Sequence, residues 1–432
     1  MSGKASTKTY LPRLLDAQLI AALDAVPAVH IAGAKATGKT ETAKQLAAST
    51  LRLDEAHTRT RLEAEPAYFT TLPEPLLLDE WQRMPELWDA VKREVDRDSS
   101  PGRFVLTGSA HPLSAQIHSG AGRIVSLRMR PFSLQERRLT EATVSLTALF
   151  AGAAQVAGGS SLQLTDYVHE ILASGFPGIR TLSARGRRLQ LAAYVDNIIF
   201  KEFPEQGHVV RAPHTLRSWL RAYAAAAATT VSYAKILNAA TPGDADKPAK
   251  TTTLAYRNIL ESLWLLDSVP AWLPSDDRLG RLGQAPKHFV ADPALAATLL
   301  DIEADDLLDG GAEADPVVRA VGAQGTLLGR LFEQLVGMSL HSYAQSAEAR
   351  LFHLRTRGGD HEVDFLVERK RRVVAFETKL SPIVRDEDVK HLLWLKERIG
   401  ARLVDAAVIT TGPEAYRRKD GIAVIPAALL GA

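Results

Sequence analysis

The sequence predicts an α/β protein whose first part is a mostly parallel sheet with helices on both faces. Three observations lead to this prediction. Short apolar runs of strand length alternate with helical segments, a glycine-framed loop joins one such run to a helix, and a later run ends in two adjacent acids. Sheets of this kind bind ligands at the carboxyl ends of their strands, so the polar residues that follow each run are the first candidates for a site.

Length and composition are those of an ordinary globular protein. The 432 residues are 46% hydrophobic and 24% charged, which allows a sizeable core and about two to four domains. A net charge of +2 argues against a strongly basic nucleic-acid coat protein. Local basic patches can still bind phosphate backbones. The absence of cysteine excludes disulfides, thiolate metal ligands and cysteine nucleophiles. With no bilayer-spanning window and no leader pattern, we expect a cytoplasmic protein without a membrane partner.

The first candidate site is the loop between an expected strand, Ala28–Ala32, and an expected helix, Glu41–Ala48. The loop fits G-x-x-x-x-G-K-[ST], in which glycines let backbone N–H groups turn toward phosphates and the helix N-terminus adds partial positive charge. Its lysine is expected to reach the β- and γ-phosphates of ATP, and its threonine to bind Mg²⁺. A chance glycine loop before a helix is the alternative. The expected nucleotide-binding residues are Gly33, Ala34, Lys35, Ala36, Thr37, Gly38, Lys39, Thr40 and Glu41.

A second buried run, Leu76–Leu78, ends in Asp79 and Glu80. Beside a phosphate-binding loop, this pattern predicts that Asp79, together with Thr40, holds Mg²⁺ and that Glu80 polarises the water that attacks the γ-phosphate. Lys39 and Glu80 are therefore expected catalytic residues. Two acids that open a solvated turn are the alternative.

Two further polar positions are candidates for catalysis. The run Phe104–Leu106 leads to Thr107 and Ser109, where a sensor of the γ-phosphate is needed, although hydroxyls at a strand end are also ordinary turn residues. Arg123, just before an expected strand at Ile124–Met129, is a candidate arginine finger or an ordinary surface arginine. Because arginine fingers in such ATPases act across subunit interfaces, Arg123 also leads us to expect a homo-oligomer.

These motifs together resemble the prokaryotic AAA-type ATPases whose C-terminal half is the DUF4143 region. The resemblance rests on the glycine loop and on Leu-Leu-Asp-Glu-Trp-Gln-Arg-Met-Pro-Glu-Leu at 77–87, Val-Leu-Thr-Gly-Ser at 105–109 and Gly-Arg…Arg-Pro-Phe-Ser-Leu-Gln-Glu at 122–136. The family often has a second threonine after the P-loop threonine, where this chain has Glu41. The resemblance implies an AAA-type ATP-binding domain, which we place at residues 1–140.

Two helical parts are expected after the ATP-binding domain. Residues 141–205 are assigned to a helical lid, whose arginines either touch phosphates or form a solvated helix face: Arg180, Arg185, Arg187 and Arg188. Residues 206–280 have the pattern of three helices and a strand-like turn, which predicts a winged helix-turn-helix domain, as the resemblance also implies. The third helix carries an acid among its polar residues, so DNA reading and a structural or protein-contacting role both stay open. Those residues are Tyr256, Arg257, Asn258 and Glu261.

The last part, residues 281–432, carries a second candidate site. A long apolar helix at 326–340 contains a single acid, Glu333. Asp364 lies on one strand of a hairpin, and Glu377 and Lys379 alternate onto one face of the neighbouring strand. Asp…Glu-x-Lys is the constellation of the PD-(D/E)xK nucleases, and the segment resembles their restriction-endonuclease-like α/β fold.

In such a nuclease, Asp364 and Glu377 bind Mg²⁺, Glu333 completes the metal site, and Lys379 orients water or offsets charge on the scissile phosphate. Charge decoration on exposed hairpin edges is one alternative, and a nuclease-like domain that no longer cleaves is another. The basic run Glu368–Arg372 is expected to be a solvated hairpin turn.

The combined interpretation is an ATPase with ATP and Mg²⁺ as cofactors that acts on nucleic acid, in DNA processing or remodelling. Two other functions stay open. One is a nucleotide-controlled regulatory or defence switch that binds protein partners, and the other is an ATP-gated, metal-dependent nuclease. The P-loop motif alone does not separate the three.

Overall fold

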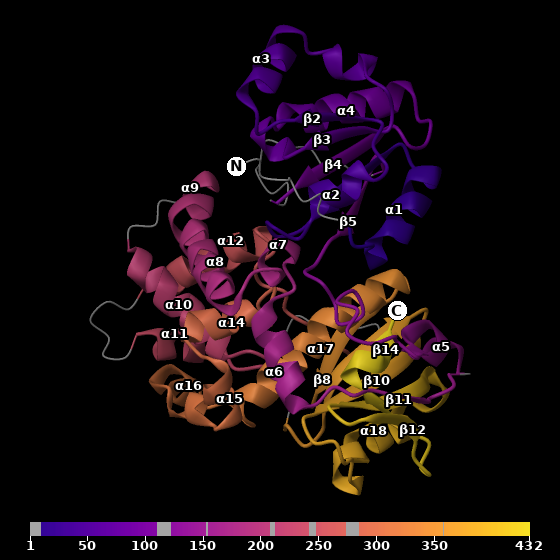
Figure 1. The fold of residues 1–432 in the computed structure, drawn as a ribbon, viewed down its shortest axis with the longest axis vertical. Helices are drawn as coiled ribbons and strands as arrows, with labels where there is room; N and C mark the ends of the chain where they lie inside the picture. The colour runs from indigo at the N-terminus through magenta and orange to yellow at the C-terminus, as the bar shows by residue number, and fades with distance from the viewer. Residues whose placement is uncertain are drawn as a thin grey trace, which may run out of the picture. The chain divides into compact units, whose positions relative to one another are not determined.

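The computed structural model of the protein describes residues 10–109, 122–152, 154–207, 212–241, 248–273, 285–356 and 358–432. The chain divides into two compact units, Met1–Met129 and Arg130–Ala432, which are described separately below. Figure 1 labels the helices and strands of both units.

The first unit is built on a five-stranded parallel sheet with strand order β2-β3-β4-β1-β5. Helices cover both faces because side chains alternate along each strand: Leu76 and Leu78 join the core formed with α3 and α4, whereas Leu77 joins the core formed with α1 and α2. The elements are α1 (Leu14–Ala25), β1 (Ala28–Ala32), α2 (Lys39–Lys44), β2 (Ser49–Arg52), α3 (Ala56–Ala64), β3 (Leu76–Asp79), α4 (Glu86–Arg97), β4 (Phe104–Gly108) and β5 (Ile124–Arg128).

The predicted parallel sheet is confirmed, including the strand that precedes the glycine loop. The helix after that loop, α2, is shorter than expected. It spans Lys39–Lys44 rather than Glu41–Ala48, because β2 already begins at Ser49 and leaves only a short turn between the two elements.

The second unit begins with a helical part. Within it, α10 contacts α11, α14 and α16, and α14 also contacts α6 and α8. The helices are α6 (Leu164–Ala173), α7 (Pro177–Arg180), α8 (Ala184–Asn197), α9 (Phe203–Glu205), α10 (Pro213–Ala225), α11 (Tyr233–Ala240), α12 (Lys250–Ser262), α14 (Pro293–Leu300), α15 (Ala304–Leu308) and α16 (Pro316–Val321). No helix within the described residues is long and apolar enough to cross a membrane.

The three helices expected between 206 and 280 are present as α10, α11 and α12. They are followed by two antiparallel β-bridges, Leu266 with Val290 and Val269 with Lys287. The order of three helices and a paired strand segment is compatible with the predicted winged helix, which stays a prediction.

The second unit continues into a seven-stranded mixed sheet with strand order β7-β12-β13-β11-β10-β9-β8. Helix α17 contacts β8, β9 and β10, and α18 contacts β9, β10 and β11. The elements are α17 (Leu327–Ser346), β8 (Arg350–Arg355), β9 (Glu362–Arg369), β10 (Arg372–Lys379), α18 (Asp386–Ile399), β11 (Leu403–Thr410), β12 (Glu414–Arg417), β13 (Ala423–Pro426) and β14 (Leu430–Gly431). The turn between β9 and β10 consists of exposed Lys370 and Arg371, as expected for a solvated hairpin turn.

Part of the expected helical lid lies on this C-terminal sheet. Strand β6 (Val144–Ser145) pairs with β14, and β7 (Gly158–Gly159) pairs with β12. Between them, α5 (Leu146–Ala151) contacts β10 and β11. The reason is the apolar face of α5, whose Leu146, Leu149 and Phe150 side chains are buried. The structure therefore places residues 144–152 and 154–159 with the last part of the chain, whereas the sequence analysis assigned them to the lid.

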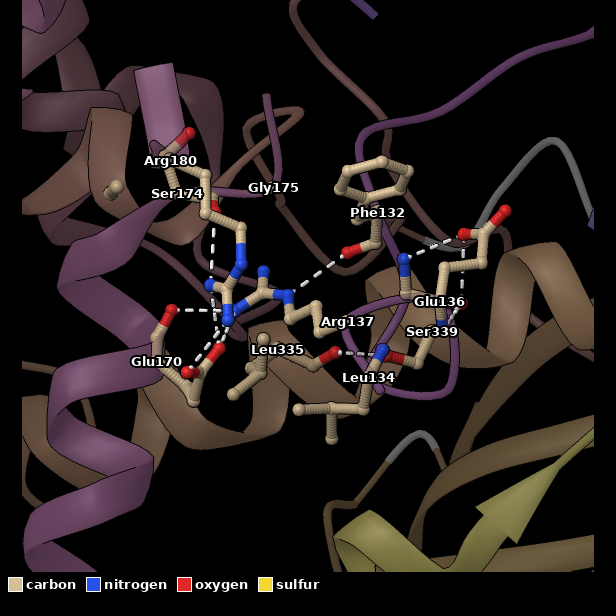
Figure 2. A network of polar contacts seen from close by, with 12 residues as sticks. Phe132, Leu134, Glu136, Arg137, Glu170, Ser174, Gly175, Arg180, Leu335 and Ser339 are labelled. Carbon is tan, nitrogen blue, oxygen red and sulfur yellow. Dashed lines mark hydrogen bonds and ion pairs between the residues drawn. The ribbon is translucent and has the colours of Figure 1, made fainter. Parts of the chain in front are cut away.

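The segment that follows β5 is fixed in the second unit by a buried polar network, shown in Figure 2. The guanidinium of Arg137 donates to the carbonyl of Phe132 at 3.1 Å and to the carbonyl and carboxylate of Glu170 at 2.6 and 2.8 Å. Arg180 donates to both carboxylate oxygens of the same glutamate, at 2.7 and 2.9 Å. Burial alone would raise the pKa of Glu170, but the two arginines hold it below its usual value. Residues 132–137 are thus joined to α6 and α7.

Candidate functional site

The glycine loop connects the end of β1 to the start of α2 at the carboxyl edge of the parallel sheet. Gly38 caps α2 with φ of 100°, a left-handed conformation that side chains other than glycine rarely adopt. At Gly33, a Cβ atom would lie 2.2 Å from the carbonyl oxygen of Met129, so only glycine fits there without a shift of the backbone. The two glycines of the motif are therefore required for the observed course of the loop.

The lysine of the loop is buried and folded back onto the loop backbone. Lys39 Nζ donates to the carbonyl oxygens of Gly33 at 3.0 Å and Ala34 at 2.9 Å. Thr37 is also buried and donates from Oγ1 to the carbonyl of Ala34 at 2.9 Å. Lys35 is half-buried and Ala36 is exposed. The ammonium group of Lys39 thus lies inside the loop that would surround a phosphate.

Two hydroxyl groups converge on one oxygen of the strand-terminal aspartate. Thr40 donates from Oγ1 to Asp79 Oδ1 at 2.7 Å, and Thr107 donates to the same oxygen at 2.5 Å. Both Asp79 and Thr107 are buried. An aspartate oxygen and a threonine hydroxyl within contact distance are the hard oxygen ligands that Mg²⁺ prefers, so these residues fit the ion that the P-loop motif implies. Thr107 thus contacts the carboxylate of Asp79 directly.

Glu80 follows β3 in an unusual backbone conformation, with φ of 58° and ψ of 47°. Its Oε2 accepts a hydrogen bond from Gln82 Nε2 at 2.5 Å, and the same nitrogen lies 3.2 Å from Ser109 Oγ. The carboxylate of Glu80 is therefore connected through Gln82 to Ser109, the other hydroxyl residue considered as a γ-phosphate sensor. Left-handed backbone at a non-glycine residue costs free energy and is typical of functional positions.

Trp81 fixes the backbone next to Glu80. Its indole Nε1 donates to His30 Nε2 at 3.1 Å, and its ring packs edge-on against the His30 imidazole. Because an indole N–H only donates, Nε2 of neutral His30 is the acceptor and Nδ1 carries the proton that reaches Ser126 Oγ at 3.3 Å. The sequence analysis missed Trp81, His30 and Gln82, although Trp81 and Gln82 directly follow the two acids.

Arg13 and Tyr10 also support the loop and were missed from the sequence. Arg13 Nη1 donates to the carbonyl of Thr37 at 2.8 Å, and Tyr10 shares a hydrogen bond with Thr42 Oγ1 at 2.9 Å. Tyr10 also donates to Asp16 Oδ1 at 2.6 Å, and burial together with this bond raises its pKa. The only sequence signal was the position of Tyr10 and Arg13, just before the first helix.

Two expected site residues do not lie with the others. Glu41 is exposed and pairs with Lys44 at 3.0 Å on the outer side of α2. Arg123 precedes β5, pairs with Asp96 at 2.6 Å, and lies at the amino end of the sheet, because Ile124 is in register with Ala28 at the start of β1. The P-loop is at the opposite, carboxyl end. The structure therefore does not bring Arg123 to the P-loop of its own unit.

The second candidate site is partly assembled, around a lysine that the sequence analysis did not consider. Lys287 Nζ lies 2.6 Å from Glu333 Oε1 on α17 and 3.0 Å from Asp364 Oδ1 on β9. Burial alone would lower the pKa of Lys287, but Asp364 and Glu333 raise it above its ordinary value. Burial and the charge of Asp364 raise the pKa of Glu333 to about 8. The sequence signal was a lysine inside the apolar stretch 286–290.

Glu377 and Lys379 extend from β10 as predicted, but Lys379 does not join the cluster. Glu377 is buried, and burial together with the charge of Asp364 raises its pKa well above the usual range. Lys379 is partly exposed and lies 3.8 Å from Asp388 on α18. Within the described residues, no group of three His, Cys, Asp or Glu side chains is arranged to hold a metal ion.

The third helix of the expected winged helix presents only part of its predicted reading face. Tyr256 is buried, and its ring packs against Trp219 and Phe203. Arg257 lies over the ring of Tyr233 and 3.7 Å from Glu261. Asn258 is exposed. Tyr256 is therefore a core residue, because position 256 lies on the apolar stripe of α12.

Family models match three consecutive parts of the chain. A model described as an AAA domain matches residues 26–137, which contain the glycine loop, Asp79, Glu80 and Thr107. A model of a domain of unknown function, DUF4143, matches residues 328–430. The chain is an AAA-type P-loop ATPase with a C-terminal DUF4143 region. Between the two, a third model, the domain of unknown function DUF8612, matches residues 164–306 of the ATPase.

Relatives of the ATPase occur in mycobacteria. One protein of Mycobacterium bovis and one of Mycobacterium tuberculosis, both described as uncharacterized, are each 24% identical over 421 residues. The match covers 95% of the ATPase and 82% of each relative. The similarity thus extends across all three matched regions.

Two solved structures have a distant likeness to the ATPase, each at 14% identity. A Walker-type ATPase of Pyrococcus abyssi matches with a TM-score of 0.38 and covers 69% of this chain and 98% of its own. The ORC2 protein of Aeropyrum pernix matches with a TM-score of 0.27 and covers 71% and 91%. TM-scores this low do not define how the parts of this chain are arranged. The geometry of the site and the family models are therefore the basis of its interpretation.

Proposed function

We propose that the ATPase hydrolyses Mg²⁺-ATP at the loop Gly33–Thr40 and uses turnover to process or remodel DNA. The observation that carries the hydrolytic part is the convergence of Thr40 and Thr107 on Asp79 Oδ1, next to Glu80. A site that only held a phosphate would not need a buried carboxylate at the position of the metal or a second acid beside it.

In this proposal the loop backbone and Lys39 bind the β- and γ-phosphates. Lys39 exchanges the carbonyl oxygens of Gly33 and Ala34 for phosphate oxygens when nucleotide enters. Thr40 and Asp79 would hold Mg²⁺, which when bound would supply positive charge beside the phosphate oxygens. Thr107 keeps Asp79 in place through its hydroxyl group.

Glu80 orients and polarises the attacking water. Its carboxylate is bonded to Gln82 in the structure, and Gln82 is also bonded to Ser109. We infer that, when the γ-phosphate is bound, the Glu80 carboxylate exchanges its hydrogen bond from Gln82 for one from the attacking water. In this inference, Ser109 senses the γ-phosphate and is coupled to Gln82 through their hydrogen bond. The backbone strain at Glu80 is compatible with such a two-state position.

Nucleic acid as the target is supported by the helical part of the second unit. Lys250 and Asn258 are exposed on α12. Helix α8 contributes Arg185, Arg187 and Arg188 to a pocket of about 610 Å³, and Arg188 also pairs with Glu303. Basic side chains on exposed helix faces supply the phosphate contacts of non-specific binding.

We propose a homo-oligomer because of the position of Arg123. At the amino end of β5, its side chain is remote from the P-loop edge of its own sheet. If Arg123 is an arginine finger, it acts on the nucleotide of a neighbouring subunit. We also propose a cytoplasmic location, because the ATP and Mg²⁺ that hydrolysis requires are available there.

The test is ATP turnover with duplex, single-stranded and branched DNA, in the wild type and in Glu80→Gln. We expect DNA to stimulate turnover in the wild type, and Glu80→Gln to bind ATP but lose turnover by at least ~100-fold, as for removal of a residue needed in the transition state. Glu63→Gln, at an exposed glutamate of α3, is the matched control and should hydrolyse at the wild-type rate. Native turnover in Glu80→Gln would refute the hydrolytic assignment, and indifference to every DNA form would refute the DNA part.

A second candidate function is a nucleotide-controlled switch that binds protein partners. It is favoured by Tyr256 and Arg257, which are engaged within the protein, so α12 offers little to DNA bases. The switch predicts slow turnover without DNA stimulation and a partner that is captured only in one nucleotide state. Pull-down with Glu80→Gln in ATP and with the wild type in ADP distinguishes it from the DNA-processing function.

A further inference from the structure

The acidic cluster of the DUF4143 region already contains a cation. Lys287 Nζ lies 2.6 Å from Glu333 Oε1, 3.0 Å from Asp364 Oδ1 and 3.7 Å from Glu362 Oε1. The lysine side chain is only 1% exposed. Two of the three N–H donors of the ammonium group are satisfied by Glu333 and Asp364, and Glu362 adds a longer ion pair.

Lys287 does not belong to the DUF4143 match. It lies within the region matched by DUF8612, residues 164–306, whereas Glu333 and Asp364 lie within residues 328–430. Its backbone is held on both sides, because Lys287 and Val269 exchange two hydrogen bonds of 2.9 Å and the next residue, His288, donates to Thr229 at 2.8 Å. The ammonium group therefore enters the cluster from a fixed backbone.

The remaining oxygen of Asp364 is occupied as well. Its Oδ2 accepts hydrogen bonds from the backbone N–H and the hydroxyl of Thr378, at 2.9 and 2.8 Å. The lysine of the nuclease motif, Lys379, lies near Asp388 instead of the cluster. Each oxygen of the central aspartate therefore already accepts at least one hydrogen bond within the protein.

A restriction-endonuclease-like fold would imply Mg²⁺ at these acids, and the pair Glu333 and Asp364 does not fit the ion. Mg²⁺ demands near-octahedral oxygen ligands at about 2.0–2.1 Å and keeps several waters. Here a positive charge stands between Glu333 and Asp364, at hydrogen-bond distance from both. A divalent ion entering beside it would meet a like charge in a buried environment, where repulsion is strongest.

We propose that Lys287 takes the place of the divalent ion, so that the DUF4143 region binds no metal at Glu333 and Asp364 and does not cleave nucleic acid there. The lysine instead ties the β-bridged segment around Lys287 to α17 and β9. This inference is independent of ATP hydrolysis, which uses the other unit.

The first arm of the test needs no change at Lys287. Full-length protein carrying Asp79→Asn, which removes the metal ligand of the P-loop, is titrated with Mn²⁺ without nucleotide and followed by electron paramagnetic resonance. We expect the same number of bound Mn²⁺ with and without an added Asp364→Asn. One Mn²⁺ per chain that disappears with Asp364→Asn would overturn the proposal.

The second arm removes the cation. In the Asp79→Asn background, Lys287→Met leaves the carboxylates without their counter-charge, and we expect one additional Mn²⁺ per chain, lost again with Asp364→Asn. Lys287→Arg keeps the charge and is the matched control, with no added Mn²⁺. A folded Lys287→Met that gains no site would show that the lysine is not what excludes the metal. Mn²⁺-dependent DNA cleavage by the wild type that is lost in Asp364→Asn would overturn the inference in either arm.

Discussion

The buried network around Arg137 gives the sharpest prediction for stability. Arg137→Met removes the hydrogen bonds of a fully buried guanidinium to Phe132 and Glu170. Loss of one partner from a buried ion pair costs about 3–5 kcal/mol, and we expect about 3 kcal/mol, because Glu170 keeps both bonds to Arg180. Arg180→Met should cost less, about 1–2 kcal/mol, since its side chain is 20% exposed. Glu170→Gln should cost most, because it leaves two arginines without their carboxylate.

The assay is native-state hydrogen exchange of the α6 amides, which reports the free energy of local opening in this unit and is not masked by unfolding of the ATP-binding unit. Arg97→Met, at an exposed arginine of α4 paired with Glu94, is the control and should leave exchange in α6 unchanged. The expected order of destabilisation is Glu170→Gln, then Arg137→Met, then Arg180→Met. If Arg180→Met destabilises α6 as much as Arg137→Met, the assignment of Arg137 as the central cation of Figure 2 is wrong.

Three further predictions follow from the geometry. Thr107→Val keeps the shape but removes the hydroxyl bond to Asp79, so kcat should fall by about 10–100-fold while ATP binding is retained, measured by turnover and nucleotide titration. Gly33→Ala places a Cβ against the carbonyl of Met129, which must then shift, so ATP affinity should fall by at least ~10-fold and the melting temperature should fall as well, and unaltered affinity would contradict the packing argument. Burial lowers the pKa of His288 to about 4, whereas it is about 6.5 in the unfolded chain. Protonation therefore favours unfolding, and about 2 kcal/mol of stability should be lost between pH 7 and pH 5. Urea unfolding at both pH values should show a change in stability that differs between the wild type and His288→Gln by about this amount.

Much of the proposed ATP site could be predicted from the sequence. Its residues lie close together along the chain, and the backbone conformation of the loop restricts which residue types fit there. Gly33 to Thr40 form one loop whose glycines are dictated by φ and by close backbone approach. Asp79 was recognised because a buried strand that ends in two acids occurs in the same chain as a P-loop motif. The hydroxyl of Thr107 was identified, but its contact with Asp79 depends on the pairing of β3 with β4, which no local pattern specifies.

For other positions, the surroundings could not be predicted from local pattern. Arg123 was a candidate arginine finger, and only the register of β5 with β1 shows that it lies at the edge of the sheet away from the P-loop of its own unit. Tyr256 was a candidate for either a DNA-facing or a structural position, and its contacts with the rings of Trp219 and Phe203 make it a core residue. Helix α5 followed the ATP-binding domain in sequence, yet its apolar face is buried on the C-terminal sheet. In each case a long-range contact outweighed the local signal.

The sequence by itself determined that this chain carries a P-loop motif, a buried strand that ends in two acids and a second set of acids near the C-terminus. These are properties of short motifs, whose chemistry is set by residue type and spacing. Only the tertiary structure decided what the second set of acids contacts. Lys287 precedes Glu333 and Asp364 by 46 and 77 residues, and a buried charge takes the partner that the fold brings within hydrogen-bond distance, whatever the separation along the chain.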